Sequence, residues 1–101
     1  LRATLEKIRG NRIIIHGTGR HSEELAPVLR DFLADISAFA DEDPARHGSR
    51  FLGIPVLAPA SAGDTGATDV VISSHLHQDD IWSRRAMYES RGLRVHRIYR
   101  D

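Results

Sequence analysis

The chain has no cysteine among its 101 residues. It can therefore form no disulfide, no thiolate metal site and no cysteine nucleophile. It also has no excess of either charge, because 14 Lys and Arg residues balance 14 Asp and Glu residues. A domain dedicated to nucleic-acid binding usually carries a basic excess on one face, so we expect no nucleic acid among the partners.

Long apolar runs are absent as well. No stretch approaches the roughly 18 residues of a membrane-spanning helix and no signal peptide is visible, so we expect a cytoplasmic protein without a membrane partner. The length suits one domain with one core, and residues 1–101 should form a single module. Because the chain begins at Leu1 rather than at methionine, we expect that module to be part of a larger protein.

The central feature of the sequence is a short apolar run that leads into a glycine turn. Ile13 to Ile15 are β-branched residues with no polar face between them, typical of a strand covered on both sides of a parallel sheet. Gly17 and Gly19 then allow the backbone to turn sharply, and a helix should start at about His21. The first N–H groups of that helix and the positive end of its dipole would face an anion, most naturally a phosphate.

The glycines also fit a known spacing. Gly17-x-Gly19-x-x-Ser22 matches a dinucleotide-binding fingerprint with serine in place of the third glycine. The acidic cluster Asp41-Glu42-Asp43 follows about 20 residues later, where ribose-binding carboxylates usually lie. The pattern favours nucleotide binding. The alternative is a strand-to-helix turn that needs glycine only for its backbone conformation.

Strands are predicted where short apolar runs end in turn signals, at 13–16, 36–40, 54–57, 69–73 and 94–98. The 54–57 run contains Pro55, which has no N–H for a ladder, and is therefore expected at a sheet edge. Strands that alternate with helices through right-handed crossovers give a small Rossmann-like α/β fold with three layers and a parallel sheet of about four strands. The first strand should be central, between 36–40 and 69–73.

Helices are predicted by stripes of apolar residues at 1–8, 21–33 and 78–91. Pro27 should delay the second helix or kink it, because proline removes a backbone hydrogen bond. Asp79 and Asp80 are expected to open the third helix, where acids complement the dipole. Segments 45–53 and 59–68 are expected to be irregular, and the second to be the most flexible part of the chain.

These motifs resemble a known family. The successions 15–21, 39–44, 47–48 and 53–57 resemble the N-terminal Rossmann-like domain of sugar O- and N-acyltransferases of the sialic-acid and bacillosamine type. Val70 to Ser74 with Gln78 to Ile81 also resembles Rossmann-like modules appended to bacterial methyltransferases and glycan-modifying enzymes. The resemblance implies a domain that binds a nucleotide sugar while a separate β-helix domain transfers the acyl group. It covers about Arg12 to Tyr99.

The resemblance also implies where the nucleotide binds. Gly17 to Gly19 and His21 match the phosphate loop, Asp41 matches the acid that meets the nucleoside, and Ser73 and Ser74 match the turn after a later strand. Arg20 stands where the family has a small residue, and it either clamps the phosphates or crowds the loop. No hexapeptide repeats are present, so acyl transfer is not inferred. The full predicted site comprises Gly17, Thr18, Gly19, Arg20, His21, Ser22, Asp41, Glu42, Asp43, Ser73 and Ser74.

Other chemistries fit the sequence less well. A zinc site could draw on His16, His21, His75 and His77, but their spacing lacks the close pairs of such sites, and solvated or phosphate-facing histidines are favoured. A hydrolase built on one of the serines would lack the G-x-S-x-G elbow. Trp82, Tyr88 and Tyr99 are expected in the core or at an interface rather than as platforms for bases. We therefore predict neither catalytic nor metal-binding residues.

The sequence favours a module that binds a nucleotide, most naturally a nucleotide sugar, for a covalently linked or associated catalytic domain. The isolated chain should then catalyse nothing. Two alternatives stay open, namely the NAD-binding half of an oxidoreductase and a structural or oligomerisation domain that has lost its ligand. Ser22 in place of the third glycine and the crowded acids slightly favour the nucleotide sugar over NAD. Homo-oligomerisation is also left open.

Overall fold

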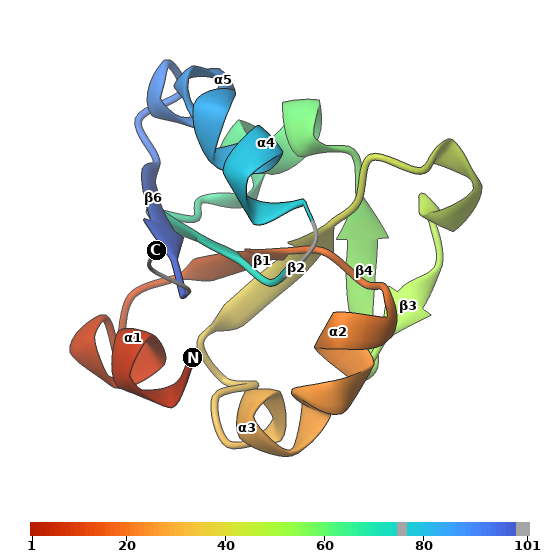
Figure 1. Cartoon of the computed structure of the whole chain (residues 1–101), viewed down its shortest axis with the longest axis vertical. Coiled ribbons are helices and arrows are strands. Elements are labelled where there is room, and N and C mark those ends of the chain that lie inside the picture. Colours follow the sequence, from red (N-terminus) through yellow and green to blue (C-terminus); the bar gives the residue numbers. More distant parts are fainter. Residues whose placement is uncertain (75–76, 99–101) are drawn as a thin grey trace.

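A computed structural model of the chain describes residues 1–74 and 77–98. Its centre is a six-stranded sheet with the order β3-β4-β2-β1-β5-β6 (Figure 1). The strands are β1 (Ile13–His16), β2 (Ile36–Ala40), β3 (Arg50–Phe51), β4 (Ile54–Leu57), β5 (Asp69–Ile72) and β6 (Arg94–Arg97). All pairs are parallel except β3 with β4. The expected α/β fold is confirmed.

Helices cover both faces of the sheet and complete three layers (Figure 1). One face carries α1 (Arg2–Lys7), α2 (Arg20–Glu24) and α3 (Ala26–Arg30). The other face carries the 3-10 helix η2 (Pro59–Thr65), α4 (Gln78–Ser83) and α5 (Ala86–Glu89). A short 3-10 helix, η1 (Pro44–Arg46), follows β2. None of the described helices is long and apolar enough to cross a membrane.

The core lies on both sides of β1. Ile13 and Ile15 point into one apolar cluster with Leu29 and Phe32, whereas Ile14 points into a second cluster with Tyr88. All three isoleucines are fully buried. This explains the run without a polar face, because each side of the strand meets a layer of helices. Each buried isoleucine contributes about 1.5–3 kcal/mol relative to an exposed one.

The register brings three strand ends to one edge of the sheet. β1 lies between β2 and β5, as predicted, and His16 stands opposite Ala40 on one side and Ile72 on the other. The residues that follow these three positions therefore leave the sheet together. They include the glycine turn, the acidic cluster and the Ser73-Ser74 pair.

The predicted sheet of about four strands is too small, because the structure has six. The segment expected to be irregular at 45–53 contains η1 and β3. Strand β4 is therefore not at the edge as predicted, since β3 pairs with it across a two-residue turn. That turn consists of Leu52 (φ 51°) and Gly53 (φ 80°), and positive φ at both positions is what a type I′ hairpin needs.

Two helical expectations also need correction. Residues 59–65 form the 3-10 helix η2, whereas an irregular segment was predicted. The helix predicted at 78–91 is divided into α4 and α5 around Arg84 and Arg85. The predicted break at Pro27 is confirmed, because α2 ends at Glu24 and proline lies in the first turn of α3.

Of the three aromatic residues expected in the core or at an interface, one lies in the core. Tyr88 is fully buried in the core. Trp82 is half-buried, with the guanidinium groups of Arg85 and Arg97 4.4 Å and 4.6 Å from its ring centroid. Tyr99 and His75 lie outside the described residues.

Candidate functional site

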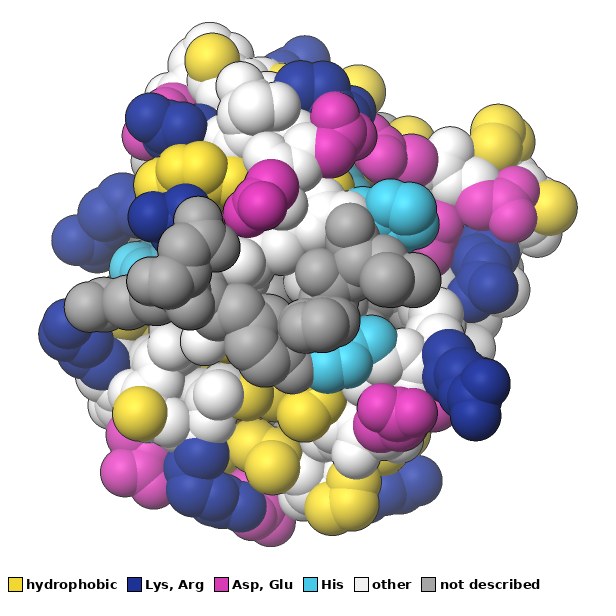
Figure 2. Space-filling view, in the orientation of Figure 1, with side chains coloured by type: hydrophobic (Ala, Val, Ile, Leu, Met, Phe, Trp, Pro, Cys, Tyr) yellow, Lys and Arg dark blue, Asp and Glu magenta, His cyan; other side chains and the backbone are white. Residues whose placement is uncertain are grey.

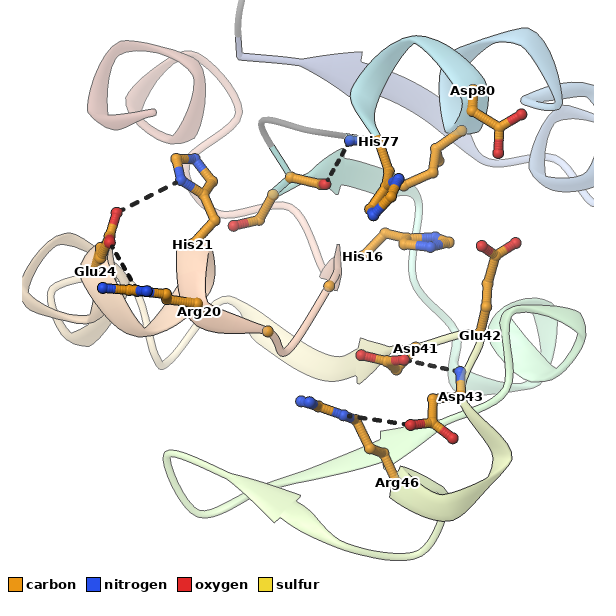
Figure 3. A pocket seen from close by; sticks show the side chains of 15 residues that line it. His16, Arg20, His21, Glu24, Asp41, Glu42, Asp43, Arg46, His77 and Asp80 are labelled. Carbon is orange, nitrogen blue, oxygen red and sulfur yellow. Dashed lines mark hydrogen bonds and ion pairs between the residues drawn. The ribbon is translucent and has the colours of Figure 1, made fainter.

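A cleft of about 640 Å³ opens where β1, β2 and β5 end (Figure 3). Its volume lies within the usual range of small-molecule sites, about 300–1,000 Å³. Figure 2 shows histidine, acidic and basic side chains mixed over this part of the surface. The lining comes from the glycine turn, the segment after β2, the segment after β5, and α4: His16, Gly17, Gly19, Arg20, His21, Glu24, Asp41, Glu42, Asp43, Arg46, Ser73, Ser74, His77, Asp80 and Ile81.

The two glycines of the turn have different roles. Gly17 has φ +123°, and a Cβ there would lie 2.6 Å from the Ser73 carbonyl oxygen. Glycine is thus needed at this position for the turn to approach the end of β5. Gly19 caps α2 with an ordinary extended backbone (φ −78°), and no atom would lie within 4 Å of a Cβ there. The backbone does not require glycine at 19, but its absent side chain leaves the cleft open.

Ser22 lies behind the turn and not in the cleft. It is fully buried, and its hydroxyl donates to the Gly17 carbonyl oxygen at 2.7 Å. Its oxygen also lies 2.9 Å from the Ser73 hydroxyl, within hydrogen-bond distance. The serine in the place of the third glycine therefore fastens the start of α2 to the turn and to the end of β5.

Asp41 links the glycine turn to the end of β2 through hydrogen bonds. Its Oδ2 accepts hydrogen bonds from the Thr18 hydroxyl at 2.6 Å and from the Thr18 N–H at 3.2 Å. Its Oδ1 accepts one from the Asp43 N–H at 2.9 Å. Burial acts to raise the pKa of Asp41, but these hydrogen bonds outweigh it and hold the pKa below its ordinary value. Asp41 is therefore ionised, and Oδ1 keeps capacity for a further donor.

Arg46 is a site residue that the sequence did not reveal. It comes from η1, and its guanidinium donates to the Thr18 carbonyl oxygen at 2.8 Å and to the Thr18 hydroxyl oxygen at 3.0 Å. It also forms an ion pair with Asp43 at 3.8 Å. Thr18 itself is buried beneath these contacts and does not line the cleft. A cation thus stands beside the glycine turn.

Arg20 and His21 stand at the mouth of the cleft (Figure 3). The Arg20 side chain is 91% exposed, and its Nε lies 3.7 Å from a Glu24 carboxylate oxygen. The His21 ring faces the same glutamate, with Nδ1 4.0 Å from the other oxygen. Because Arg20 points into solvent, it does not crowd the loop.

An ion-pair bridge joins the end of β2 to α4. Arg84 binds both carboxylate oxygens of Glu42 and lies 2.9 Å from Asp80. The hydrogen bond from Arg84 is the main reason why the pKa of Glu42 is lowered. All three side chains are roughly half-exposed or more. The Glu42–Arg84–Asp80 bridge therefore ties together two walls of the cleft at its outer edge.

The remaining polar groups lie near β5. Ser73 is buried, and the Ser74 hydroxyl oxygen accepts a hydrogen bond from the His77 N–H at 3.1 Å. His16 is only 3% exposed and lies on the cleft floor. Within the described residues, no group of three or more His, Cys, Asp or Glu side chains is arranged to hold a metal ion.

The structure brings together most of the predicted site. Gly17, Gly19, Arg20, His21, Asp41, Glu42, Asp43, Ser73 and Ser74 line the cleft, whereas Thr18 and Ser22 are buried behind it. The predicted site lacked His16, Glu24, Arg46, His77, Asp80 and Ile81. For His16, the signal was present in the sequence, since it is the last residue of the first strand and directly precedes the glycine turn.

No family model and no curated protein matches the sequence, but solved structures match the fold. The UDP-D-quinovosamine 4-dehydrogenase from Vibrio fischeri matches with a TM-score of 0.64 and 21% identity over 88% of this chain and 78% of that one. RSP, a Rex-family repressor, matches with a TM-score of 0.69 and 11% identity over 96% of this chain and 56% of that one. The chain has a Rossmann-like fold.

A third match agrees with this assignment. The chorismate mutase/shikimate 5-dehydrogenase fusion protein from Clostridium acetobutylicum has a TM-score of 0.55 and 12% identity over 94% of this chain and 46% of that one. The chain thus spans about half the length of the repressor and of the fusion protein. At such identities the likeness shows the fold alone, so the resemblance to sugar acyltransferases stays a prediction.

Proposed function

We propose that the cleft binds a nucleotide, most naturally a nucleotide sugar, and presents it to a catalytic domain outside this chain. The observation that carries the proposal is the meeting of the glycine turn, the acids after β2 and the Ser73-Ser74 turn in one cleft. That cleft lies where the strand order reverses at β1, and open α/β sheets bind their ligands at such a point.

The cleft offers a place for each part of a nucleotide. Phosphates approach the open side of Gly19, with the Arg46 guanidinium beside the turn and the exposed Arg20 guanidinium at the mouth. The free capacity of Asp41 Oδ1 suits a ribose hydroxyl. The negative charges of Glu42 and Asp43 are offset by Arg84 and Arg46, so they repel a phosphate less than free carboxylates would.

Two neighbours in fold support a nucleotide as the ligand. One is a dehydrogenase named for a UDP-sugar, UDP-D-quinovosamine. The repressor RSP has been solved in complex with β-NADH, and with β-NAD⁺ and operator DNA. NAD is therefore the second candidate ligand, which would make this chain the cofactor-binding half of an oxidoreductase. Asp41, an acid directly after β2, is the feature that favours NAD, whereas the further acids Glu42 and Asp43 beside it favour the nucleotide sugar.

Isothermal titration calorimetry with UDP-N-acetylglucosamine and with NAD tests the proposal. The wild type should bind one of them, whereas Gly19→Val should bind neither and should still fold, because its β-branched side chain fills the open side of the turn at an unstrained φ. Gly63→Ala is the control, since its Cβ would make only ordinary contact with Arg91 at 3.4 Å. It should bind like the wild type.

The same titration separates the two candidate ligands and tests the role of Arg20. Arg20→Ala should weaken binding more at low salt than at high salt, because salt already screens an exposed charge from phosphate. Unchanged affinity in a folded Gly19→Val protein would move the site away from this turn and leave its glycines as turn formers only.

A further inference from the structure

His16 is a buried histidine with one ring nitrogen paired and the other directed to the cleft. It is the last residue of β1, and its Nδ1 lies 2.5 Å from the Tyr88 hydroxyl oxygen, from α5. The two rings meet at 89°. Figure 3 shows the imidazole in the middle of the site, between His77 and Asp41.

The position of the proton between His16 and Tyr88 follows from counting donors. Tyr88 is fully buried, and His16 Nδ1 is the one hydrogen-bond partner that its hydroxyl has among the described residues. A buried hydroxyl proton without an acceptor costs about 1–3 kcal/mol. Tyr88 therefore donates to Nδ1. A neutral imidazole that accepts at Nδ1 carries its own proton at Nε2.

The neutral form of His16 is the one that the surroundings favour. Burial lowers the pKa of His16, and Arg84 acts in the same direction, while the carboxylates of Glu42 and Asp41 partly oppose them. Burial also raises the pKa of Tyr88, which keeps its hydroxyl protonated. His77 and Asp80, before and within α4, are the other ionisable groups on this side of the cleft.

A histidine that serves only the core would have both nitrogens bonded within the protein. Here Nε2 has no hydrogen-bond partner in the described residues, although none of their fully buried side-chain nitrogen or oxygen atoms lacks one. Nε2 is therefore reached from the cleft that His16 lines. A fixed, neutral N–H donor stands on the floor of that cleft.

We propose that His16 is a ligand-recognition residue whose Nε2–H donates to an uncharged oxygen of the nucleotide, a carbonyl or a hydroxyl, and that Tyr88 is the positioning residue that fixes its tautomer. This rests on the proposed function of the cleft. An uncharged oxygen is favoured over a phosphate because the carboxylates of Asp41 and Glu42 lie on this side. The phosphate groups have the turn, Arg20 and Arg46 elsewhere in the same cleft.

Nitrogen-15 NMR of the uniformly labelled chain reads the tautomer directly. The ligand-free wild type should show His16 as the neutral Nε2–H form at pH 7. Tyr88→Phe should give a mixture of tautomers and raise the pKa of His16, because the donor to Nδ1 is gone. A purely structural role for Tyr88 would leave both quantities unchanged. An Nδ1–H tautomer in the wild type would overturn the inference.

Calorimetry with UDP-N-acetylglucosamine and NAD then tests recognition. His16→Leu should weaken binding of whichever probe the wild type binds by roughly five- to tenfold, the loss expected for one neutral hydrogen bond. His16→Gln keeps an N–H donor and should recover most of that loss. His96→Gln is the matched control, because His96 also has one ring nitrogen paired, with Asp69, but on β6 away from the cleft. Its affinity should equal that of the wild type.

Protonation of His16 at Nδ1 leaves the Nε2–H donor in place, so the affinity of the wild type should not fall as the pH drops through the pKa of His16, below 6.5. If a probe binds the wild type without moving the NMR signals of His16, and binds His16→Leu equally well, this inference fails and the proposed function stands. If neither probe binds the wild type, the proposed function fails and recognition by His16 fails with it.

Discussion

At the scale of single residues, Gly17 and Gly19 have different roles. Gly17 is needed for the fold of the turn, whereas Gly19 leaves the cleft open. Gly17→Ala would force a side chain into the left-handed region and against the Ser73 carbonyl oxygen, which should lower the free energy of unfolding by about 2–3 kcal/mol. Gly19→Ala meets neither problem and should change it by less than about 1 kcal/mol in either direction. Urea denaturation of both variants measures the difference. Equal losses would mean that the turn is not held against β5 as described.

Asp41 gives the glycine turn a dependence on pH. Its folded pKa is below the ordinary 3.8, so its stabilising contribution is present above pH 3.8 and is lost as the pH falls through the folded pKa. Asp41→Asn should cost about 1–2 kcal/mol at pH 7, because an amide N–H would face donors of Thr18 or Asp43.

Unfolding free energies from pH 7 down to pH 2.5 check this expectation. The difference between the wild type and Asp41→Asn should shrink as the pH falls below 3.8. Asp64→Asn removes the same formal charge from an exposed position in η2 and serves as the control for net charge. If the free energies of unfolding of the wild type and of Asp41→Asn differ by the same amount at every pH, the Asp41 carboxylate does not hold the turn.

The sequence located the residues of the site that follow a strand, because parallel strand ends meet at one edge. Gly17 and Asp41 were predicted from the fingerprint spacing as well, and Ser73 from the resemblance to sugar acyltransferases. Arg46 was not, since its place depends on η1 folding back so that the guanidinium reaches Thr18. Ser22 was placed in the cleft by spacing alone, whereas its burial depends on the close approach of α2 to β5.

At the scale of elements, the Glu42–Arg84–Asp80 bridge should hold α4 against the end of β2. Exposed ion pairs contribute little to global stability, so Arg84→Ala should change the free energy of unfolding by less than about 1 kcal/mol. Amide hydrogen exchange in α4 should nevertheless become faster, because this short helix buries only Gln78 and Ile81.

The matched control for Arg84→Ala is Arg2→Ala, which breaks an exposed ion pair with Asp31 far from the cleft. It should leave exchange in α4 unchanged, and high salt should reduce the difference between the two variants. Exchange in α4 that is the same in the wild type and in Arg84→Ala would show that the bridge does not restrain this wall of the cleft.

The elements that the sequence missed are those too short or too irregular for a periodic pattern. Strand β3 has two residues, which is less than one repeat of side-chain alternation. Its hairpin turn uses Leu52-Gly53 instead of the Asn-Gly or Asp-Gly pair that usually marks such turns. The 3-10 helix η2 has only Pro59 and Ala62 buried, so no apolar stripe identifies it.

At the scale of the whole molecule, the three layers could be predicted because two features of the sequence, the isoleucine run and the alternation of strands with helices, point to the same fold. The isoleucine run required cover on both faces, and alternation of strands with helices supplied it through right-handed crossovers. The central position of β1 between β2 and β5 was predicted on the same basis and is confirmed. The same order places the reversal of the sheet at the glycine turn, and hence the cleft at that edge.

The most direct test of the central claim is the thermal unfolding of the full chain with UDP-N-acetylglucosamine, NAD and coenzyme A. A ligand at 100 times its dissociation constant adds about 2.7 kcal/mol of stability, which in a domain of this size raises Tm by on the order of 10 °C. We expect such a rise in the wild type with UDP-N-acetylglucosamine or NAD, and none in Gly19→Val. An unmoved Tm in the wild type with every ligand, or an equal rise in both proteins, would contradict a nucleotide site at this turn.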